Sequence, residues 1–391
     1  MNVLNRILLC SALAVWAMHA CASPVFVKTD KGCSALKIMD QNNVSATWTG
    51  SCRNLRVSGI GVLQWFDQDK VLILSQKGTF YDGAQTGYGV MDWPLLKYTY
   101  QGETLNSEPH GNGMITFEGG NILRGTFYRG NISYGEIRKN NGSYFGPTNN
   151  GTIDGKGILL LDNGDRYEGY LKDGLKSGIG KFTSANGGSY EGEFVDDMFN
   201  GMGKLTAADG RVDEGKYVNN LMNGQGTRTW PGGDRYEGEF SNGLPNGSGT
   251  MLFKNGDRLV GVFVDGKHVG KGHYFSIEGW SYQGDFKNGQ RHGNGIYIYT
   301  DKTRYEGEFS NGELEGYGVL TWPNGGHYEG EFLAGELAGQ GMKTWINGDI
   351  YVGRFSKGVP EGHGVMTKAN GQVLKGYFAH GVYVGDPKIA H

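Results

Sequence analysis

The residues best placed to do chemistry are recurrent glutamates, most of them in pairs two positions apart. They are Glu168, Glu191 with Glu193, Glu237 with Glu239, Glu306 with Glu308, and Glu329 with Glu331. Two neighbouring carboxylates can act as a general acid and a general base, but only where different surroundings separate their pKa values. Every pair here stands in nearly the same local sequence, so the surroundings are alike. The pattern does not favour catalysis.

A basic residue often stands two positions before the first glutamate of a pair. The basic residues are Arg166, Arg235, Arg304 and His327. Side chains two positions apart share one face of a strand, so this alternation favours a ladder of surface ion pairs across neighbouring strands. The alternative that stays open is a strip of carboxylates that binds cations or a basic partner.

The nine histidines and four cysteines form no recognisable catalytic or metal-binding motif. His110 and His292 hold the same place in their copies of a repeat, just before a Gly-x-Gly, and others stand alone. No Cys/His spacing matches a zinc site, and no Gly-x-Ser-x-Gly elbow is present. We therefore expect no catalytic residue, no metal ligand and no cofactor-binding residue.

The elements that position these side chains follow from the segment 305–325. Tyr305, Gly307 and Phe309 alternate with the glutamates, which predicts a strand with one packed face and one solvated face. Asn311-Gly312 is a strong hairpin signal, because both residues tolerate positive φ. A second strand is expected from about residue 316 to 322, and Asn324-Gly325 then reverses the chain. No helical period of 3.6 residues appears after the first 22 residues, so the chain is predicted to be all-β.

This hairpin recurs every 23 residues. The copies in strict register start at Tyr144, Tyr167, Tyr190, Asp213, Tyr236, Leu259, Tyr282, Tyr305, Tyr328, Tyr351 and Leu374, and looser copies start at Trp48, Gln76, Tyr100 and Leu123. A period between 20 and 50 residues is typical of a solenoid, in which each unit buries its face against its neighbours. No copy contains reactive residues that would set it apart from the others as a catalytic site.

Glycine is the most unusual part of the composition, with 70 residues of 391. A glycine occupies the third position of every copy, and a Gly-x-Gly pair follows, as at Gly316 and Gly318. Glycine inside a strand weakens it, so its recurrence needs a steric reason. We expect these positions to leave room for the rings of Tyr305 and Phe309 to lie across the neighbouring strand.

The unit Tyr-x-Gly-x-Phe, an Asn-Gly turn and a later Gly-x-Gly resembles the MORN (membrane occupation and recognition nexus) repeat, over about residues 48–385. The resemblance implies an elongated, single-layer antiparallel β-sheet solenoid of about 15 tandem hairpins, often curved into a groove. The departures are Asp213, Leu259 and Leu374 at the leading position, and Thr148 and Leu171 at the fifth. The copy at Leu123 is two residues short, so a kink or irregular hairpin is expected near residues 128–150.

The other repeated feature is aromatic. A single-layer sheet cannot cover both of its faces, so some aromatic surface is either wet or covered by a partner. Trp230, Trp322 and Trp345 are the candidate partner-binding aromatics.

Residues 1–22 are predicted to be a signal peptide, with Arg6 before an apolar stretch and Ala20-Cys21-Ala22 before the cleavage point. Lipid modification at Cys21 is the alternative, disfavoured because Met18-His19-Ala20 matches the usual preceding residues poorly. The chain is therefore expected in a periplasm or cell envelope, or secreted.

Cys33 and Cys52 remain after removal of that segment, and in an oxidising compartment the default is a disulfide between them. It would close a loop of about 20 residues and contribute roughly 3 kcal/mol in the chain-entropy model. We expect it to fasten an N-terminal cap, residues 23–47, onto the first repeat. Irregular repeats are assigned to 48–143, regular ones to 144–385 and a tail to 386–391.

These features predict a non-catalytic exported scaffold that binds protein partners, or itself as a homodimer, through its groove or its C-terminal edge strand. The alternative is a cell-envelope protein that binds glycans or lipid headgroups. A formal net charge of −3 and the absence of a polybasic cluster argue against nucleic acid and make electrostatic lipid binding weak. An enzyme is disfavoured, because no stretch of about 100 residues lacks repeats and could hold a catalytic domain.

Overall fold

The computed structural model describes residues 24–149 and 151–385, in two compact units that divide between Ala208 and Asp209. The predicted signal peptide and C-terminal tail lie outside these residues. Every helix or strand among the described residues is a β-strand, and the pairing is mostly antiparallel. The all-β hairpin-repeat fold is confirmed.

The first unit contains eighteen strands. They are β1 (Phe26–Lys28), β2 (Ser34–Leu36), β3 (Ser45–Trp48), β4 (Ser51–Arg53), β5 (Arg56–Phe66), β6 (Leu72–Tyr81), β7 (Ala84–Trp93), β8 (Tyr98–Leu105), β9 (Glu108–Phe117), β10 (Ile122–Tyr128), β11 (Asn131–Lys139), β12 (Gly142–Asn149), β13 (Thr152–Ile153), β14 (Gly155–Leu161), β15 (Arg166–Lys172), β16 (Leu175–Thr183), β17 (Ser189–Val195) and β18 (Met198–Thr206).

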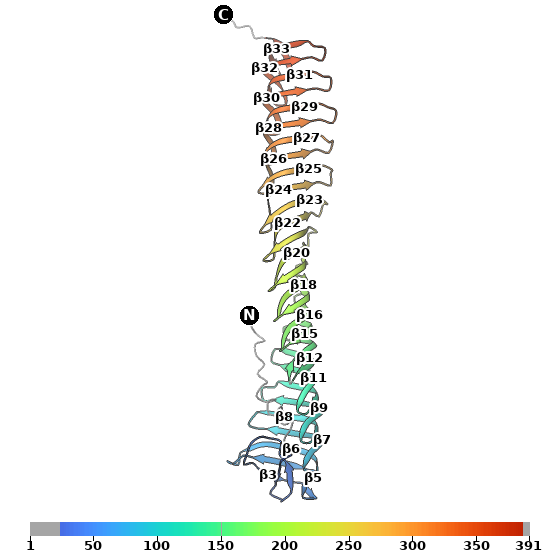
Figure 1. Ribbon diagram of the computed structural model, residues 1–391, viewed down its shortest axis with the longest axis vertical. Helices are drawn as coiled ribbons and strands as arrows, with labels where there is room; N and C mark the ends of the chain where they lie inside the picture. Colours follow the sequence, from blue (N-terminus) through green and yellow to red (C-terminus); the bar gives the residue numbers. More distant parts are fainter. Residues whose placement is uncertain (1–23, 150, 386–391) are drawn as a thin grey trace. The chain divides into compact units, whose positions relative to one another are not determined.

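The second unit contains sixteen strands. They are β19 (Val212–Val218), β20 (Leu221–Thr229), β21 (Arg235–Ser241), β22 (Leu244–Leu252), β23 (Arg258–Val264), β24 (Lys267–Phe275), β25 (Ser281–Lys287), β26 (Gln290–Ile298), β27 (Arg304–Ser310), β28 (Glu313–Thr321), β29 (His327–Leu333), β30 (Glu336–Thr344), β31 (Ile350–Ser356), β32 (Val359–Thr367), β33 (Val373–Ala379) and β34 (Val382–Gly385). Within this unit the hairpins follow one another in chain order (Figure 1).

The hairpin β27–β28 shows how the sequence makes one repeat. Tyr305 and Phe309 are buried, and the glutamates between them are exposed, as the alternation predicts. We call the face that holds the leading tyrosines, such as Tyr305, the tyrosine face, and the opposite face, with Glu306 and Glu308, the glutamate face. The first turn is Asn311-Gly312 with φ of 50° and 91°, which matches the two-residue turn that favours a right-twisted hairpin.

The connection between copies is longer than an Asn-Gly turn. In the loop after β28, the N–H of Trp322 donates to the carbonyl of Gly326 at 2.9 Å, and the N–H of Gly325 donates back to the carbonyl of Trp322 at 2.9 Å. Gly325 has a φ of 92°, a conformation that glycine adopts without cost. The two ends of each strand therefore carry loops of different length.

The third-position glycines line up across the sheet. Gly307 faces Gly318 in β28, and Gly318 faces Gly330 in β29. A methyl group on Gly318 would lie 2.5 Å from the ring of Tyr305. The ring thus lies flat over two facing glycines, which confirms the steric explanation of their recurrence.

The hydroxyl of each leading tyrosine is also fixed. It donates to the carbonyl three residues later, at 2.5–3.2 Å, in the copies that start at Tyr100, Tyr144, Tyr167, Tyr190, Tyr236, Tyr282, Tyr305, Tyr328 and Tyr351. The ring of Tyr305 meets Phe309 of its own strand edge-on at 5.2 Å and Phe332 of the next copy at 4.9 Å. Edge-on aromatic pairs at this distance are favourable, so each tyrosine ties its copy to the following one.

At both ends of the strands, the turns and loops of neighbouring copies are joined by hydrogen bonds. At the first turns, the N–H of Gly312 donates to the carbonyl of Arg291 at 2.9 Å, one repeat earlier. At the second loops, a carboxylate accepts a backbone N–H of the next loop, as Asp349 does from Ala369 at 2.9 Å. Backbone groups in loops need such partners, and here the neighbouring copy supplies them.

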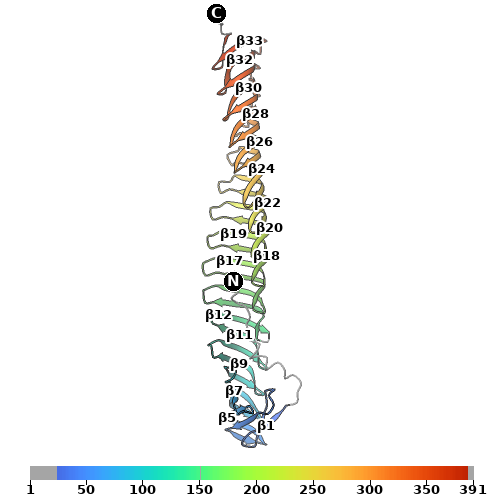
Figure 2. The same cartoon turned by 90° about the vertical axis from the view of Figure 1, so that its left-hand side faces the viewer.

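The N-terminal strands pair with one another and with β5. β1 pairs with β2, and β2, β3 and β4 all pair with β5, in the blue region of Figure 2. The predicted disulfide joins Cys33 to Cys52, with the Cα atoms 5.9 Å apart. Trp48 takes the place of a leading tyrosine, because its ring lies over Gly50 and Gly61.

The repeat is irregular after β11. In a regular copy the second strand is continuous over nine residues, as in β16. In the copy that starts at Tyr144 it is divided into the two-residue strand β13 and the strand β14, and both pair with β12. The structure thus has an irregular hairpin close to the region where the short copy predicts one.

Candidate binding surfaces

The paired glutamates have structural partners. Arg304 Nη2 lies 2.5 Å from Glu306, and Arg166 Nη2 lies 2.6 Å from Glu168. These ion pairs run along one strand, between residues i and i+2, whereas the sequence suggested pairs across strands. Lys181 and Glu191, at 3.6 Å, are a cross-strand example.

The second glutamate of each pair has a different role. In β28 and its equivalents, the first glycine of Gly-x-Gly has positive φ and forms part of a β-bulge, as Gly339 does with a φ of 51°. The carboxylate of Glu331 accepts the N–H of Gln340, just after that glycine, at 2.9 Å. Glu103 accepts the N–H of Asn112 in the same way at 3.1 Å. These carboxylates satisfy backbone donors that the bulge leaves unpaired.

Residues nine positions after the leading position compensate for a missing tyrosine. In three copies that start with another residue, a side chain from the second strand covers the two facing glycines instead. The substitutes are Gln85 for Gln76, Met222 for Asp213 and His268 for Leu259. His268 lies between Phe263 and Phe286, at 5.5 and 4.9 Å between ring centroids, and burial lowers the pKa of its imidazole.

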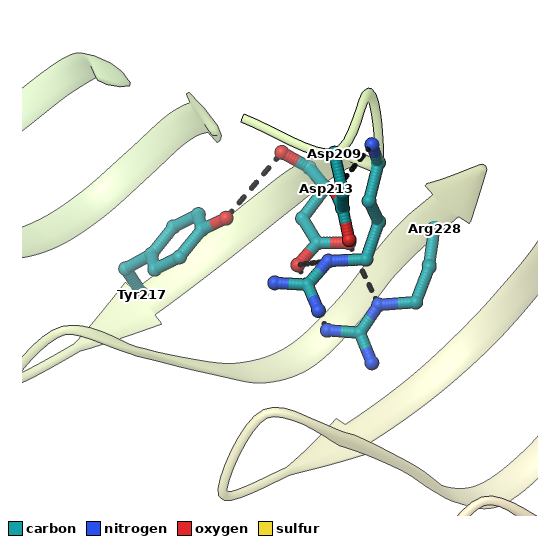
Figure 3. A network of polar contacts seen from close by, with 5 residues as sticks. Asp209, Asp213, Tyr217 and Arg228 are labelled. Atoms are coloured by element: carbon teal, nitrogen blue, oxygen red, sulfur yellow. Dashed lines mark hydrogen bonds and ion pairs between the residues drawn. The ribbon is translucent and has the colours of Figure 1, made fainter. Parts of the chain in front are cut away.

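Asp213 and Arg228 are both buried, and Figure 3 shows their side chains next to each other. Arg228 donates from Nε and Nη2 to the two carboxylate oxygens at 2.7 and 2.8 Å, and Arg211 Nε lies 3.3 Å from Oδ2. Tyr217 donates to the backbone carbonyl of Asp213 at 3.3 Å. This bidentate pair stands at the two repeat positions where the copy at Tyr305 has Tyr305 and Leu320. Two basic groups share one carboxylate, so the arrangement is that of a structural ion pair.

The described residues contain no group of three or more His, Cys, Asp or Glu side chains that could hold a metal ion. Nor does any helix able to span a membrane occur in the part of the chain that the structure describes.

The predicted aromatics lie on the tyrosine face of the second unit, and all three are half-buried. Trp322 and Trp345 pack against the buried core, and the ammonium of Lys343 lies 5.1 Å from the centroid of each indole. An ammonium over an indole is held by the ring quadrupole. Burial lowers the pKa of Lys343. The structure therefore brings two of the three tryptophans to one cation.

Trp322 and Lys343 line a groove of about 600 Å³. The groove also contains Tyr299, Asp301, Thr303, Leu314, Leu320, Phe332, Glu336, Leu337 and Lys357. We call it the aromatic groove. Trp345 does not line the groove itself but contacts Lys343, which does. Trp230 does not line it either, and lies beside Arg228, 5.9 Å from ring centroid to guanidinium carbon.

Tyr299 is a groove residue that the sequence reasoning missed. It stands 23 residues before Trp322, at the same place in its copy, and Phe253 stands at that place in an earlier copy. A comparison of this repeat position in all copies would have identified Tyr299. Arg291, which stacks on Tyr297 at 4.7 Å, had no comparable signal.

Among the residues that the structure describes, β34 is the last strand of the second unit, and it pairs with β33. Val382 and Val384 of this strand are 63% and 59% exposed. An edge strand leaves unpaired backbone groups that can accept another strand.

A family model described as "MORN repeat" matches ten segments, residues 77–94, 100–122, 167–189, 190–210, 214–235, 236–258, 282–304, 305–327, 328–350 and 351–373. The copy at residues 259–281 is not among them. No curated protein matches the sequence.

Some solved structures are similar in part. The wild-type TCP10 domain of Danio rerio CPAP is 12% identical, covering 56% of this chain and 96% of that chain, with a TM-score of 0.31. The SAS-4 TCP domain of Drosophila melanogaster, in complex with a proline-rich motif of Ana2, is 10% identical, covering 46% and 85%, with a TM-score of 0.25. A virginiamycin B lyase from Staphylococcus aureus is 12% identical, covering 58% and 85%, with a TM-score of 0.13. Scores this low carry no argument about function.

Proposed function

This chain belongs to the MORN repeat family, and from that premise we propose that it is a non-catalytic exported scaffold that binds a protein partner through the aromatic groove. The observation that carries the proposal is the groove itself. Trp322 and Trp345 flank Lys343, and half-buried aromatic rings beside a cation are typical of the residues that dominate the binding energy of interfaces. The repeated carboxylates already have structural partners, which supports a non-catalytic role.

A site-specific crosslink tests this proposal. A photo-reactive residue at position 322 in the mature chain should capture a discrete partner from the envelope fraction, and the same residue at position 230 should not. The double variant Trp322→Ala/Trp345→Ala should reduce recovery of that partner at least about tenfold, as expected for hot-spot tryptophans. Trp230→Ala is the matched control, because it removes the same ring at the same repeat position outside the groove. Equal loss in both variants would contradict the proposal.

Self-association through β34 is a second mode, supported by the two exposed valines of that edge strand. Charged residues on an edge oppose strand addition, so Val382→Lys/Val384→Lys should convert a dimer into a monomer. Light scattering over a range of concentrations measures this. A wild-type chain that is monomeric throughout would remove the dimer from consideration.

Export rests on the segment before Ser23, and its proposed route is cleavage after Ala22. Mass spectrometry of the chain purified from its native envelope should show a mature N-terminus at Ser23. A diacylglycerol adduct on Cys21 would establish lipid anchoring instead.

A further inference from the structure

The glutamate face changes character in the second unit. The copy that starts at Leu259 carries Val260 and Val262 where regular copies have glutamates, and these valines are 37% and 46% exposed. The next copy has Gln283 in place of the first glutamate. This is also where the family model leaves residues 259–281 unmatched. The stripe of carboxylates is therefore interrupted over neighbouring hairpins.

The register brings the replacing residues into one row. Val260 faces His273, His273 faces Gln283, Gln283 faces Ile296, and Ile296 faces Glu306. The row crosses the five strands β23 to β27, which at about 4.8 Å between strands spans roughly 19 Å. Each strand thus contributes one side chain in succession.

A groove of about 570 Å³ runs beside this row. Lys271 and Asn294 line its other side, and its floor is the backbone of Gly272, Gly284, Gly295 and Gly307. Substituents at these glycines would point to the tyrosine face, so no side chain rises from the floor. We call this the glycine-floored groove.

Three polar side chains of the groove have hydrogen-bonding groups that a ligand can use. Within the described residues, the side-chain amides of Gln283 and Asn294 and the ammonium of Lys271 make no hydrogen bond or ion pair. Glu306, at one end, is already paired with Arg304 at 2.5 Å. His273 is held by stacking on Phe275 at 3.8 Å, and Arg258 lies over the same Phe275 ring at 4.4 Å.

The charges of the groove nearly cancel. Lys271 stands opposite Asp285 in the register. Burial and the nearby Arg258 lower the pKa of His273, which favours its neutral imidazole. The groove therefore has no excess of positive charge to attract a highly charged ligand, such as nucleic acid or an anionic membrane surface.

The shape of the groove favours a polysaccharide over a peptide. A peptide would need either an unpaired strand edge or pockets for alternate side chains, whereas the strands β23 to β27 are paired on both sides and the floor is glycine backbone. Amide side chains offer both a donor and an acceptor, which suits hydroxyl groups that do the same. We propose that the glycine-floored groove binds an extended, uncharged β-linked polysaccharide whose sugars follow one another across the strands.

Isothermal titration of the mature chain with cellohexaose and chitohexaose, both extended β-1,4-linked chains, tests the proposal. We expect saturable binding of at least one of them that does not weaken with salt. Maltohexaose, which coils, and hexaglutamate, a charged peptide, should not bind. Equal binding of maltohexaose or hexaglutamate overturns the proposal, as does the absence of binding by either β-linked chain.

Variants locate the site. Gln283→Ala/Asn294→Ala should weaken binding at least about tenfold, the effect of losing two hydrogen bonds to the ligand. Gln225→Ala/Gln340→Ala is the matched control, because both residues share the repeat position of Asn294 outside the groove. Val260→Glu/Gln283→Glu rebuilds the regular glutamates and should fold but not bind. Unchanged affinity in that variant, or equal loss in the control, overturns the assignment.

This site is independent of the proposed partner site. Trp322→Ala/Trp345→Ala alters the opposite face and should leave the sugar titration unchanged. A failure of either proposal is thereby distinguishable from a failure of the other.

Discussion

At the scale of single residues, the leading tyrosine and its two glycines act as one unit. The ring of Tyr305 covers Gly307 and Gly318, and its hydroxyl donates to the carbonyl of Glu308 at 2.9 Å. The tyrosine ring, the two glycines and the carbonyl are packed closely together, so a change in any one of them displaces the others.

Gly318→Ala should therefore destabilise the second unit. The added methyl group would lie 2.5 Å from the Tyr305 ring, and overpacking of this kind costs about 1–3 kcal/mol. Urea unfolding followed by circular dichroism measures the loss. Gly232→Ala is the control, because no atom lies within 4 Å of its added methyl group and its φ is not in the left-handed region; equal loss in both would contradict the explanation.

The buried tyrosines predict that the folded chain loses stability at alkaline pH. Burial raises the pKa of Tyr167, Tyr190, Tyr236 and Tyr282 to about 12, against about 10 in an unfolded chain. A raised pKa of the folded state means stability that is complete below pH 10 and is lost as the pH rises towards 12.

Unfolding midpoints in urea should accordingly be constant from pH 8 to about 9.5 and fall steeply above pH 10. Ultraviolet absorbance of tyrosinate in the folded chain should lag behind that of an unfolded control. Tyrosinate that appears with the same midpoint in both states would show that the rings are accessible.

Much at this scale could be predicted from the sequence. Recurrent glycines beside large rings give the steric reason directly. The role of Glu331 as acceptor for the Gln340 N–H could not be foreseen, because the bulge that frees this N–H adds residues to one strand only.

At the scale of the hairpin, the leading residue and the residue nine positions later share one space. His268 lies over Gly261 and Gly272 because Leu259 leaves that space empty. The two positions should therefore show strong coupling in a double-mutant cycle.

Leu259→Tyr alone should destabilise the second unit by about 1–3 kcal/mol, because the new ring would overlap the imidazole of His268. Leu259→Tyr/His268→Leu, which reproduces the residues of the copy at Tyr305, should recover the loss. Denaturant unfolding of the wild type, both single variants and the double variant measures the coupling. Additive effects would contradict a shared space.

The ion pair of Figure 3 gives a second prediction at this scale. Arg228→Met leaves the carboxylate of Asp213, which is 2% exposed, without its bidentate partner. Breaking a buried pair in this way costs about 3–5 kcal/mol.

Asp213→Tyr/Met222→Leu/Arg228→Leu converts the copy to the residues of the copy at Tyr305. It should be at least as stable as the wild type, since apolar replacement of a buried pair is often neutral or stabilising. Thermal unfolding compares the two chains. A triple variant less stable than Arg228→Met would show that the pair has a further role.

The sequence identified Asp213 as a departure from the repeat but not its partner. Arg228 follows 15 residues later, and which residue faces Asp213 depends on how many residues the bulge between Gly215 and Tyr217 adds. The sequence shows the recurrent Gly-x-Gly but not that a bulge forms there, so the register of the second strand emerged only from the structure.

At the scale of the whole molecule, a solenoid transmits stability only between neighbouring copies. The disulfide between Cys33 and Cys52, 19 residues apart, constrains the N-terminal part of the first unit. Its contribution of about 3 kcal/mol in the chain-entropy model should therefore remain local.

Cys33→Ser/Cys52→Ser should lower hydrogen-exchange protection of residues 24–66 by about a hundredfold, the rate equivalent of about 3 kcal/mol. Protection of residues 209–385 should be unchanged. Uniform loss along the chain would show that the repeats unfold as a single cooperative body.

The candidate sites were only partly predictable at this scale. Trp322 and Trp345 follow from the aromatic period, but Lys343 between them does not, because only the structure shows its two contacts with the indoles. The glycine-floored groove is invisible in any single copy. It depends on residues from three successive copies that the register aligns.

The shared space between a leading residue and its ninth successor limits how a gene for this chain can change length. Unequal recombination that breaks within the second loops, near residues 232, 255 or 278, moves both positions together and keeps every pair matched. A break inside a hairpin would join the Leu259 of one parent to a foreign partner in place of His268. Insertions and deletions that survive should consequently begin and end in those loops, so that inherited copy number changes by whole hairpins.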